Sequence, residues 1–264
     1  MGCGKNFHSD WINVDLDSKY DKVIKCNFLK EFPFEEDEFD VVYHSHVLEH
    51  LSKEDGKVFI KNCYRILKPE GIIRIVVPDL EEIVKLYLES LDKAFNEDHL
   101  ASKNYDWILI ELFDQMARDK SGGKMSEYLS QETLGNEKFV ISRMGNYGKD
   151  LIKQLRRKNK YKSLSKKESK YLSFRKIFDN FRKCLLTDEE KQFIKTGQFR
   201  NSGEIHKWMY DRYSLKDLLE KTGFKNIQIM EAYQSNIHDW EKYELDYSNG
   251  EVRKPDSLFI EAMK

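Results

Sequence analysis

Short apolar runs alternate with amphipathic segments over the first 80 positions of the chain. Runs at 11–14, 23–26, 39–43 and 72–77 have the length of strands, and the last is apolar at nearly every position, as in a strand covered on both faces. Between the last two runs, Phe59, Cys63, Ile66 and Leu67 share one helical face, which a capping pattern at 52–55 precedes. This alternation predicts an α/β fold built on a parallel sheet.

The pattern becomes helical after Asp79, which with Glu82 forms a second capping pattern. Apolar residues at 80, 83, 84, 87, 91 and 95 line one face of the predicted helix. Helical periodicity continues from about 100 to 200, with a helix at 106–118 and another that starts at Thr187, and no strand is predicted there. Strand patterns return at 226–233 and 257–263, after a helix that Gly223 ends. We therefore predict three parts, namely a first core segment (1–98), a helical insertion or lid (99–202), and a core completion (203–264).

Charge is distributed unevenly along the chain. The 264 residues include 45 Lys and Arg against 46 Asp and Glu, a formal net charge of −1. Residues 149–183 alone hold 14 basic and 3 acidic side chains, and Tyr171, Phe174, Phe178, Phe181 and Leu185 form a predicted apolar helix face in this region. Such a segment can meet nucleic acid, an anionic membrane surface or a phosphorylated substrate, or it is a solvated helix face.

The cysteines and the hydropathy pattern bear on the compartment. The four cysteines lie far apart with no C-x-x-C pair, so we read them as reduced thiols. No apolar run approaches the length of about 20 residues that a membrane span needs, and the first residues lack a signal-peptide pattern. These observations predict a cytoplasmic protein without a transmembrane segment.

Five motifs follow one another in the first 80 residues. They are Gly2-Cys3-Gly4, an acidic Asp15 after a strand, Phe32-Pro33-Phe34 before the next buried strand, Val47-Leu48-Glu49-His50-Leu51, and Arg65-Ile66-Leu67-Lys68-Pro69-Glu70-Gly71. In this order and spacing they resemble the class I S-adenosylmethionine (SAM) methyltransferases of the type 11 group. The resemblance implies a Rossmann-like, mostly parallel sheet with an antiparallel C-terminal hairpin, and SAM as the cofactor. In that family an apolar central strand precedes the glycine loop, so we expect such a strand upstream of Met1.

The resemblance also implies where SAM binds. Ligands of open α/β sheets bind at the carboxyl ends of the strands, where glycines let backbone N–H groups approach. Gly2 and Gly4 would border the methionine part, and Asp15 would accept hydrogen bonds from the ribose hydroxyls. Asn27 replaces an acidic residue that the family often uses near the adenine, although its amide oxygen still accepts. The predicted cofactor-binding residues are Gly2, Cys3, Gly4, Asp15, Leu16, Asn27, Phe28 and His44.

Histidines supply the candidate chemistry on the acceptor side. Residues 46–50 also fit the H-x-x-E-H pattern of inverted zinc proteases, but His46 falls at a strand-to-helix junction, and we predict no metal. His46 and His206 are the predicted catalytic residues, because histidine is the natural base at neutral pH. For His44 and His46 a structural role is the alternative.

Residues 203–213 gather the side-chain types of a polar substrate pocket. Asp79, Tyr210 and Arg212 are the predicted substrate contacts. The alternative is a capped turn whose aromatic residues pack in the core.

We therefore predict a cytoplasmic SAM-dependent methyltransferase whose acceptor is a small molecule or glycan, with a sugar or glycan precursor favoured by residues 203–213. One alternative is a non-catalytic binding module of degenerate methyltransferase fold, which Asn27 and the lack of a central strand before Gly2 in this sequence would favour. The other is an RNA methyltransferase that uses the basic residues 149–183.

Overall fold

The computed structural model describes residues 1–96, 98–162 and 186–264. Its main sheet has the strand order β3-β4-β8-β5, and a separate parallel pair is formed by β1 and β2. The strands are β1 (Asn13–Asp15), β2 (Val23–Lys25), β3 (Phe39–Ser45), β4 (Leu67–Pro78), β5 (Lys225–Met230) and β8 (Ser257–Met263). The predicted α/β class is confirmed. The main sheet is mixed rather than mostly parallel, because β8 runs antiparallel to both β4 and β5 and only β3 and β4 are parallel.

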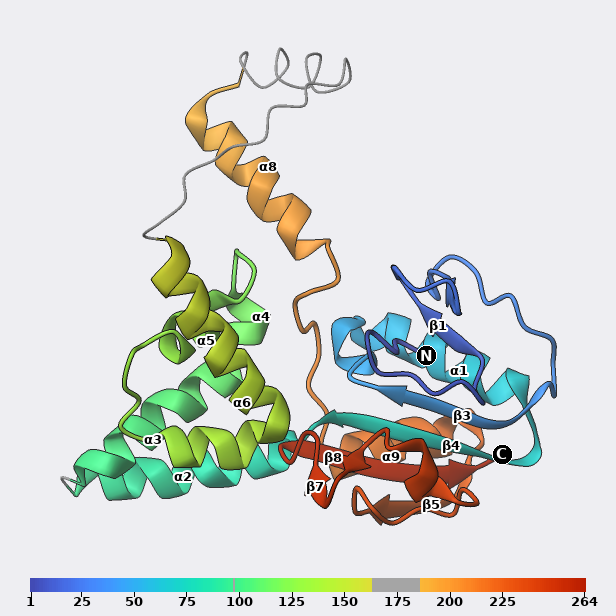
Figure 1. Cartoon of the computed structure of the whole chain (residues 1–264). Coiled ribbons are helices and arrows are strands. Elements are labelled where there is room, and N and C mark those ends of the chain that lie inside the picture. Colours follow the sequence, from blue (N-terminus) through green and yellow to red (C-terminus); the bar gives the residue numbers. More distant parts are fainter. Residues whose placement is uncertain (97, 163–185) are drawn as a thin grey trace.

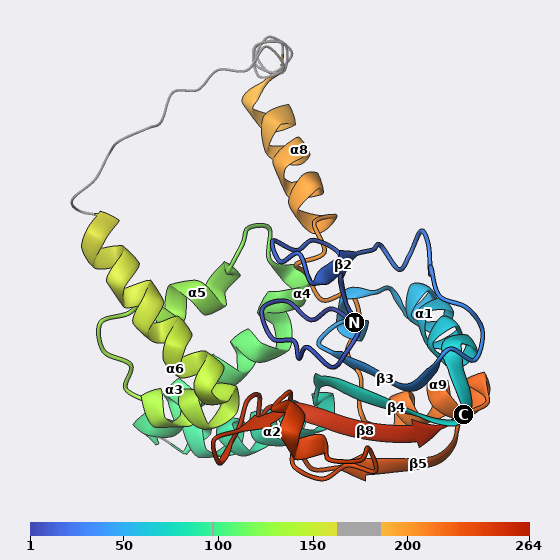
Figure 2. The same cartoon turned by 45° about the vertical axis from the view of Figure 1, so that its right-hand side comes forward.

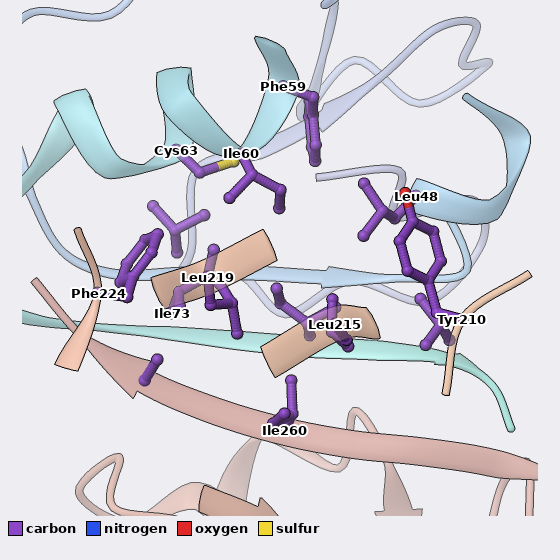
Figure 3. Close-up of a cluster of buried hydrophobic side chains, with 14 of the residues drawn as sticks. Leu48, Phe59, Ile60, Cys63, Ile73, Tyr210, Leu215, Leu219, Phe224 and Ile260 are labelled. Carbon is purple, nitrogen blue, oxygen red and sulfur yellow. The ribbon is translucent and has the colours of Figure 1, made fainter. Parts of the chain in front are cut away.

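One face of the main sheet packs against α1 (Lys53–Ile66) and α9 (Arg212–Thr222) (Figure 3). Side chains of a strand alternate between the faces, so Ile73, Ile75 and Val77 of β4 point to this side. The predicted apolar face of α1 is fully buried here, and Ser52 caps that helix by accepting from the backbone N–H of Asp55. This core fixes the end of β3, where the predicted site begins.

The opposite face of the sheet is covered by the segment between β5 and β8, which includes η3 (Trp240–Tyr243), β6 (Tyr247–Ser248) and β7 (Glu251–Val252). Arg74 holds this segment from the centre of β4. Its fully buried guanidinium donates to Asp246 at 2.7 Å and to Glu261 at 2.7 Å, and also to the backbone carbonyls of residues 231, 232 and 234. Buried charges need partners of this kind. The C-terminal strands therefore pair as predicted but are joined by a long, anchored connection.

The remaining helices lie beside the sheet (Figures 1 and 2). They are α2 (Leu80–Phe95), α3 (His99–Leu109), η2 (Ile110–Asp114), α4 (Gln115–Ala117), α5 (Gly123–Leu129), α6 (Glu137–Lys162) and α8 (Asp188–Arg200). A second apolar core joins α2, α3, α5 and α6 around Trp107, Leu129 and Val140. The helix α8 lies apart from both the main sheet and this group of helices, which we call the helical body, and none of its residues is buried.

These helices match the sequence prediction in part. Asp79 caps α2, Thr187 caps α8, and no strand occurs among the described residues between 100 and 200. The helix expected at 106–118 begins earlier, at His99, and contains a π-helical turn. Phe95, placed on the buried face of α2, is 85% exposed. The predicted apolar face at 171–185 lies outside the described residues.

Two backbone features position the site. The Met1 amino group donates to the carbonyl oxygen of Tyr43 at 2.8 Å, and the Gly2 N–H donates to that of Val14 at 2.7 Å, so the first residues lie between β1 and β3. The helix α6 kinks at Gly145, whose φ of 60° is open to glycine at little cost.

None of the described helices is long and apolar enough to cross a membrane.

Candidate active site

The glycine loop folds back on the carboxyl end of β1. The Gly4 N–H donates to Asp15 Oδ2 at 2.8 Å, and the Asp17 N–H lies 3.3 Å from Oδ1. Gly2 and Gly4 both have positive φ, and a Cβ on Gly4 would meet no atom within 4 Å. A carboxylate has about four lone-pair positions, so Asp15 keeps capacity to accept from further hydroxyls. Gly2, Cys3, Gly4 and Asp15 are thus brought together, with open space at Gly4 and with Gly2 packed against Val47.

The other predicted cofactor residues differ in accessibility. Leu16 is 56% exposed beside Asp15, and one of its methyl groups lies near Gly203. Asn27 uses its amide oxygen to accept from the Leu29 N–H at 3.0 Å. Phe28 packs edge-on against Phe59, with 5.6 Å between the ring centroids, and so borders the core.

His44 lies in the core rather than in a cavity. Its ring is fully buried and packs edge-on against Phe59 at 5.1 Å, and neither ring nitrogen has a hydrogen-bond partner. Burial, aided by the nearby Met1 amino group, lowers the pKa of His44 to about 3. His44 is therefore a neutral histidine in the core. These surroundings fit the structural role that we gave as the alternative for this residue.

A cavity of about 710 Å³ opens between the start of the chain, the main sheet and α6. Gly2 and Cys3 border one end, and Ser45 and His46 lie at the carboxyl end of β3. Its volume falls in the range of about 300–1,000 Å³ typical of small-molecule sites. The cavity therefore connects the glycine loop with the predicted catalytic histidine.

His46 lies in the wall of this cavity and of a second one, of about 390 Å³. It follows β3 with a φ of 54°. Its Nδ1 is 2.9 Å from Glu49 Oε1, and its Nε2 is 3.1 Å from the Ser257 hydroxyl. The ring is thus held on both sides at the junction of the two cavities.

The second cavity contains His206, the other predicted catalytic residue. The segment before α9 is tied to η1 (Leu48–His50), because the Lys207 N–H donates to the carbonyl oxygen of Glu49 at 2.7 Å. His206 is 5% exposed and its ring meets that of His50 edge-on at 4.8 Å. Burial lowers the pKa of His206 to about 3 despite the nearby carboxylate, so its imidazole is neutral.

Glu49 lies between these histidines and is fully buried. Burial raises the pKa of a carboxyl group, but His46, His206 and His50 together outweigh burial and lower the pKa of Glu49 to about 2. Glu49 therefore carries a negative charge in the interior. Sequence reasoning treated it only as part of a loop motif.

The three predicted substrate residues line neither cavity. Tyr210 is 3% exposed and lies beside Leu48 in the sheet core (Figure 3), and burial raises its pKa to about 12. Asp79 caps α2, and Arg212 pairs with Glu81 on the surface. Asp79 and Tyr210 thus fit the alternative of a capped turn with core aromatics, and substrate contact by these three residues stays a prediction.

Among the residues that line both cavities, sequence reasoning missed two with polar groups, Tyr147 of α6 and Lys254. Burial lowers the pKa of the Lys254 ammonium, which lies 5.6 Å from the Tyr147 ring centroid. Lys254 comes from the connection between β5 and β8 and Tyr147 from the helical body. No local motif marks either residue, and only the tertiary fold brings them together.

Comparison with known proteins identifies the first part of the chain. Residues 2–75 match a family model described as a methyltransferase domain. This stretch of the chain matches the type 11 family of SAM-dependent methyltransferases. The predicted resemblance and its cofactor class are thereby confirmed, and the domain includes Gly2, Asp15 and His46.

Two individual proteins are similar to this chain. The phosphoethanolamine N-methyltransferase of Plasmodium falciparum (isolate 3D7) is 29% identical over 182 residues, which are 69% of this chain and 55% of that protein. The chain thus spans about half the length of this curated relative. A crystal structure of a SAM-dependent methyltransferase from Archaeoglobus fulgidus aligns with a TM-score of 0.35 and 14% identity, over 95% of this chain and 74% of that one.

Proposed function

We propose that the chain transfers the methyl group of SAM to a polar small molecule bound near His46. The position of His46 carries the proposal, because it joins a cavity bordered by Gly2 and Cys3 to a second cavity lined by polar side chains. The family match over residues 2–75 supports the cofactor. SAM supplies an activated methyl group, and the chain supplies placement, since in-line orientation accounts for much of the acceleration of such a transfer.

The residues around the glycine loop suit the cofactor. Asp15 offers free acceptor positions at the end of β1, and Gly4 faces open space. The exposed Leu16 beside them offers an apolar surface for a ring. We assign Gly2, Cys3, Gly4, Asp15 and Leu16 to cofactor binding. The predicted cofactor contacts of Asn27 and Phe28 stay predictions, and the burial of His44 counts against its contact.

We assign His46 as the base for a hydroxyl acceptor. Glu49 at 2.9 Å favours the tautomer that carries its proton on Nδ1, so the lone pair is on Nε2, where the acceptor hydroxyl would replace the Ser257 hydroxyl that lies at 3.1 Å. A sugar or glycan precursor is the acceptor class we favour, because the second cavity mixes Arg118, Glu111, His206 and Lys254. Phosphoethanolamine, named for the Plasmodium relative, is the second acceptor to test.

Isothermal titration calorimetry with SAM and with its demethylated product tests the cofactor assignment. Asp15→Ala should weaken binding by about 10-fold or more, because hydrogen bonds to a charged group contribute about 1.5–3 kcal/mol each. Asp17→Ala is the matched control, since Asp17 pairs with Lys25 on the surface. Equal affinities for the two variants would place the cofactor elsewhere.

Product formation from SAM with sugars, nucleotide sugars and phosphoethanolamine tests the acceptor. With the acceptor that reacts, His46→Gln should lower kcat by about 100-fold or more if its hydroxyl is methylated. An unchanged kcat in His46→Gln would remove the base role. SAM binding without turnover of any acceptor would instead favour the non-catalytic alternative.

The RNA methyltransferase alternative rests on residues 149–183. Most of them lie outside the described residues, and two of the described ones are paired, Lys149 with Glu251 and Arg156 with Glu137. Salt-sensitive RNA binding that is lost in an Arg156→Gln/Arg157→Gln variant would support that alternative.

A further inference from the structure

Three side chains with metal-binding atoms converge in the wall of the second cavity. Glu49 and His50 come from η1, and His206 comes from the segment before α9. One ligand atom from each lies within 4.8 Å of the other two. Residues more than 150 positions apart are thus assembled by the contacts that tie this segment to η1.

The ring of His50 is oriented as metal-binding histidines usually are. Its Nδ1 lies 3.1 Å from the carbonyl oxygen of Ile205, and a carbonyl only accepts, so Nδ1 carries the proton. The ring nitrogen that can bind a metal is then Nε2. A hydrogen bond from the second ring nitrogen to a backbone carbonyl is the usual partner of a metal-bound imidazole.

The cluster contains buried polar atoms that lack partners. Neither Glu49 oxygen accepts a hydrogen bond of good geometry, and His206 Nδ1 has no partner. Such atoms cost about 1–3 kcal/mol each when left unsatisfied, and more when charged. Glu49 Oε1 lies at ion-pair distance from His46 Nδ1, which leaves Oε2 for another cation.

The geometry is close to that of an open metal site. A tetrahedral ion with bonds of about 2.1 Å brings its ligand atoms to about 3.4 Å from each other. The ligand atoms of this cluster lie within 4.8 Å of one another, so small side-chain rotations would bring them to the separation that a bound ion needs. Two histidines and one glutamate are also the protein ligands of many catalytic zinc sites, whose fourth position is left to water or substrate.

We propose that Glu49, His50 and His206 bind a divalent transition-metal ion of the Zn²⁺ class, with its fourth position open to the second cavity. This site is independent of SAM binding. Imidazole and carboxylate donors suit Zn²⁺ better than Mg²⁺ or Ca²⁺, which prefer oxygen ligands alone. The competing explanation is that the contact with His46 at 2.9 Å is the partner that Glu49 needs in the interior.

The test uses the full chain, freed of any histidine tag, stripped with chelator and titrated with Zn²⁺ against a chromogenic competitor. We expect one Zn²⁺ per chain and, with Co²⁺, the visible absorption of a four-coordinate ion. Glu49→Gln, His50→Gln and His206→Gln should each weaken binding by at least about 100-fold, since loss of an outer-shell partner alone costs 10- to 100-fold. Circular dichroism checks that each variant folds.

The matched controls are His8→Gln and His238→Gln. His8 lies beside Asp10 and His238 beside Asp239, so they report binding at surface His–Asp pairs. Both should keep native affinity and the Co²⁺ spectrum. If His206→Gln does not fold, the zinc affinity of His50→Gln decides between the two explanations, because His50 is less buried than His206. Absence of stoichiometric Zn²⁺ binding, or native affinity in His50→Gln, would overturn the proposal in favour of the His46–Glu49 pair, whether or not SAM binds.

Discussion

At the scale of single residues, the partners of a buried polar group decide its role. Arg74 and His44 are neighbouring examples on β4 and β3, and both are fully buried. Arg74 meets two carboxylates and three carbonyls, so its charge holds the β5–β8 connection. His44 has no hydrogen-bond partner and stays neutral. Full burial thus makes Arg74 the centre of a structural ion cluster, whereas it leaves His44 as a group that is costly to protonate.

The neutral His44 should make the protein sensitive to acid. Its pKa is lowered to about 3 in the folded chain, against 6.5 for an ordinary histidine. Between these values the unfolded chain binds one more proton, so stability is lost as the pH falls through 6.5 towards 3. The free energy of unfolding should therefore fall less steeply with pH in His44→Leu, by about 1.4 kcal/mol per pH unit. Urea denaturation from pH 7 to pH 4 measures the slope, and equal slopes in both proteins would contradict the argument.

At the scale of elements, two helices share one capping signal but differ in packing. Ser52 caps α1 and Thr187 caps α8, each by accepting from a backbone N–H three residues on. The helix α1 buries five residues, whereas α8 buries none. A helix without a buried face contributes little to global stability, because most helical stability in proteins comes from packing.

The two caps should therefore respond differently to removal. Ser52→Ala should lower the free energy of unfolding by about 0.5–2 kcal/mol. Thr187→Ala should leave that value within about 0.5 kcal/mol and instead speed hydrogen exchange locally in α8. Urea denaturation and hydrogen exchange by mass spectrometry measure the two effects. A global loss in Thr187→Ala as large as that in Ser52→Ala would mean that α8 is packed in solution.

At the scale of the whole molecule, the described residues form two large apolar cores with no buried member in common, besides a small cluster on the other face of the sheet. One lies between the sheet and the helices α1 and α9, and the other joins α2, α3, α5 and α6. The second cavity lies where they meet, since its wall includes His46 and Glu49 beside the sheet and Trp107 and Met144 of the helical body. The predicted division at residues 98 and 202 stays a prediction.

Matched core substitutions should reveal how far the two bodies unfold separately. Leu129 and Leu219 are both fully buried, one in each core. Each Leu→Ala change should cost about 2–5 kcal/mol. In hydrogen exchange, Leu129→Ala should lose protection in α3, α5 and α6, and Leu219→Ala in the sheet with α1 and α9. Identical exchange patterns would mean that the two bodies unfold as one unit.

The sequence predicted local features better than assembled ones. The strands near Val14 and Ile75, the caps at Ser52 and Asp79, and the methyltransferase domain itself follow from short patterns. The burial of Tyr210 could not be predicted, because a polar aromatic side chain suits a pocket and a core equally well. The convergence of His50, His206 and Lys254 depends on contacts across more than 150 positions, which no periodicity encodes.

The kink of α6 at Gly145 places an unusual constraint on the turn opposite it. A Cβ at this position would come within 2.9 Å of the carbonyl oxygens of Val252 and Arg253 and within 2.7 Å of Pro255. Surface turns normally tolerate insertions and deletions. Here residues 252–255 pack against the helix backbone at Gly145, and the same residues place Lys254 in the walls of both cavities. An insertion or deletion in these residues should therefore disturb the packing on α6 and the position of Lys254 more than a substitution that keeps the length of the segment.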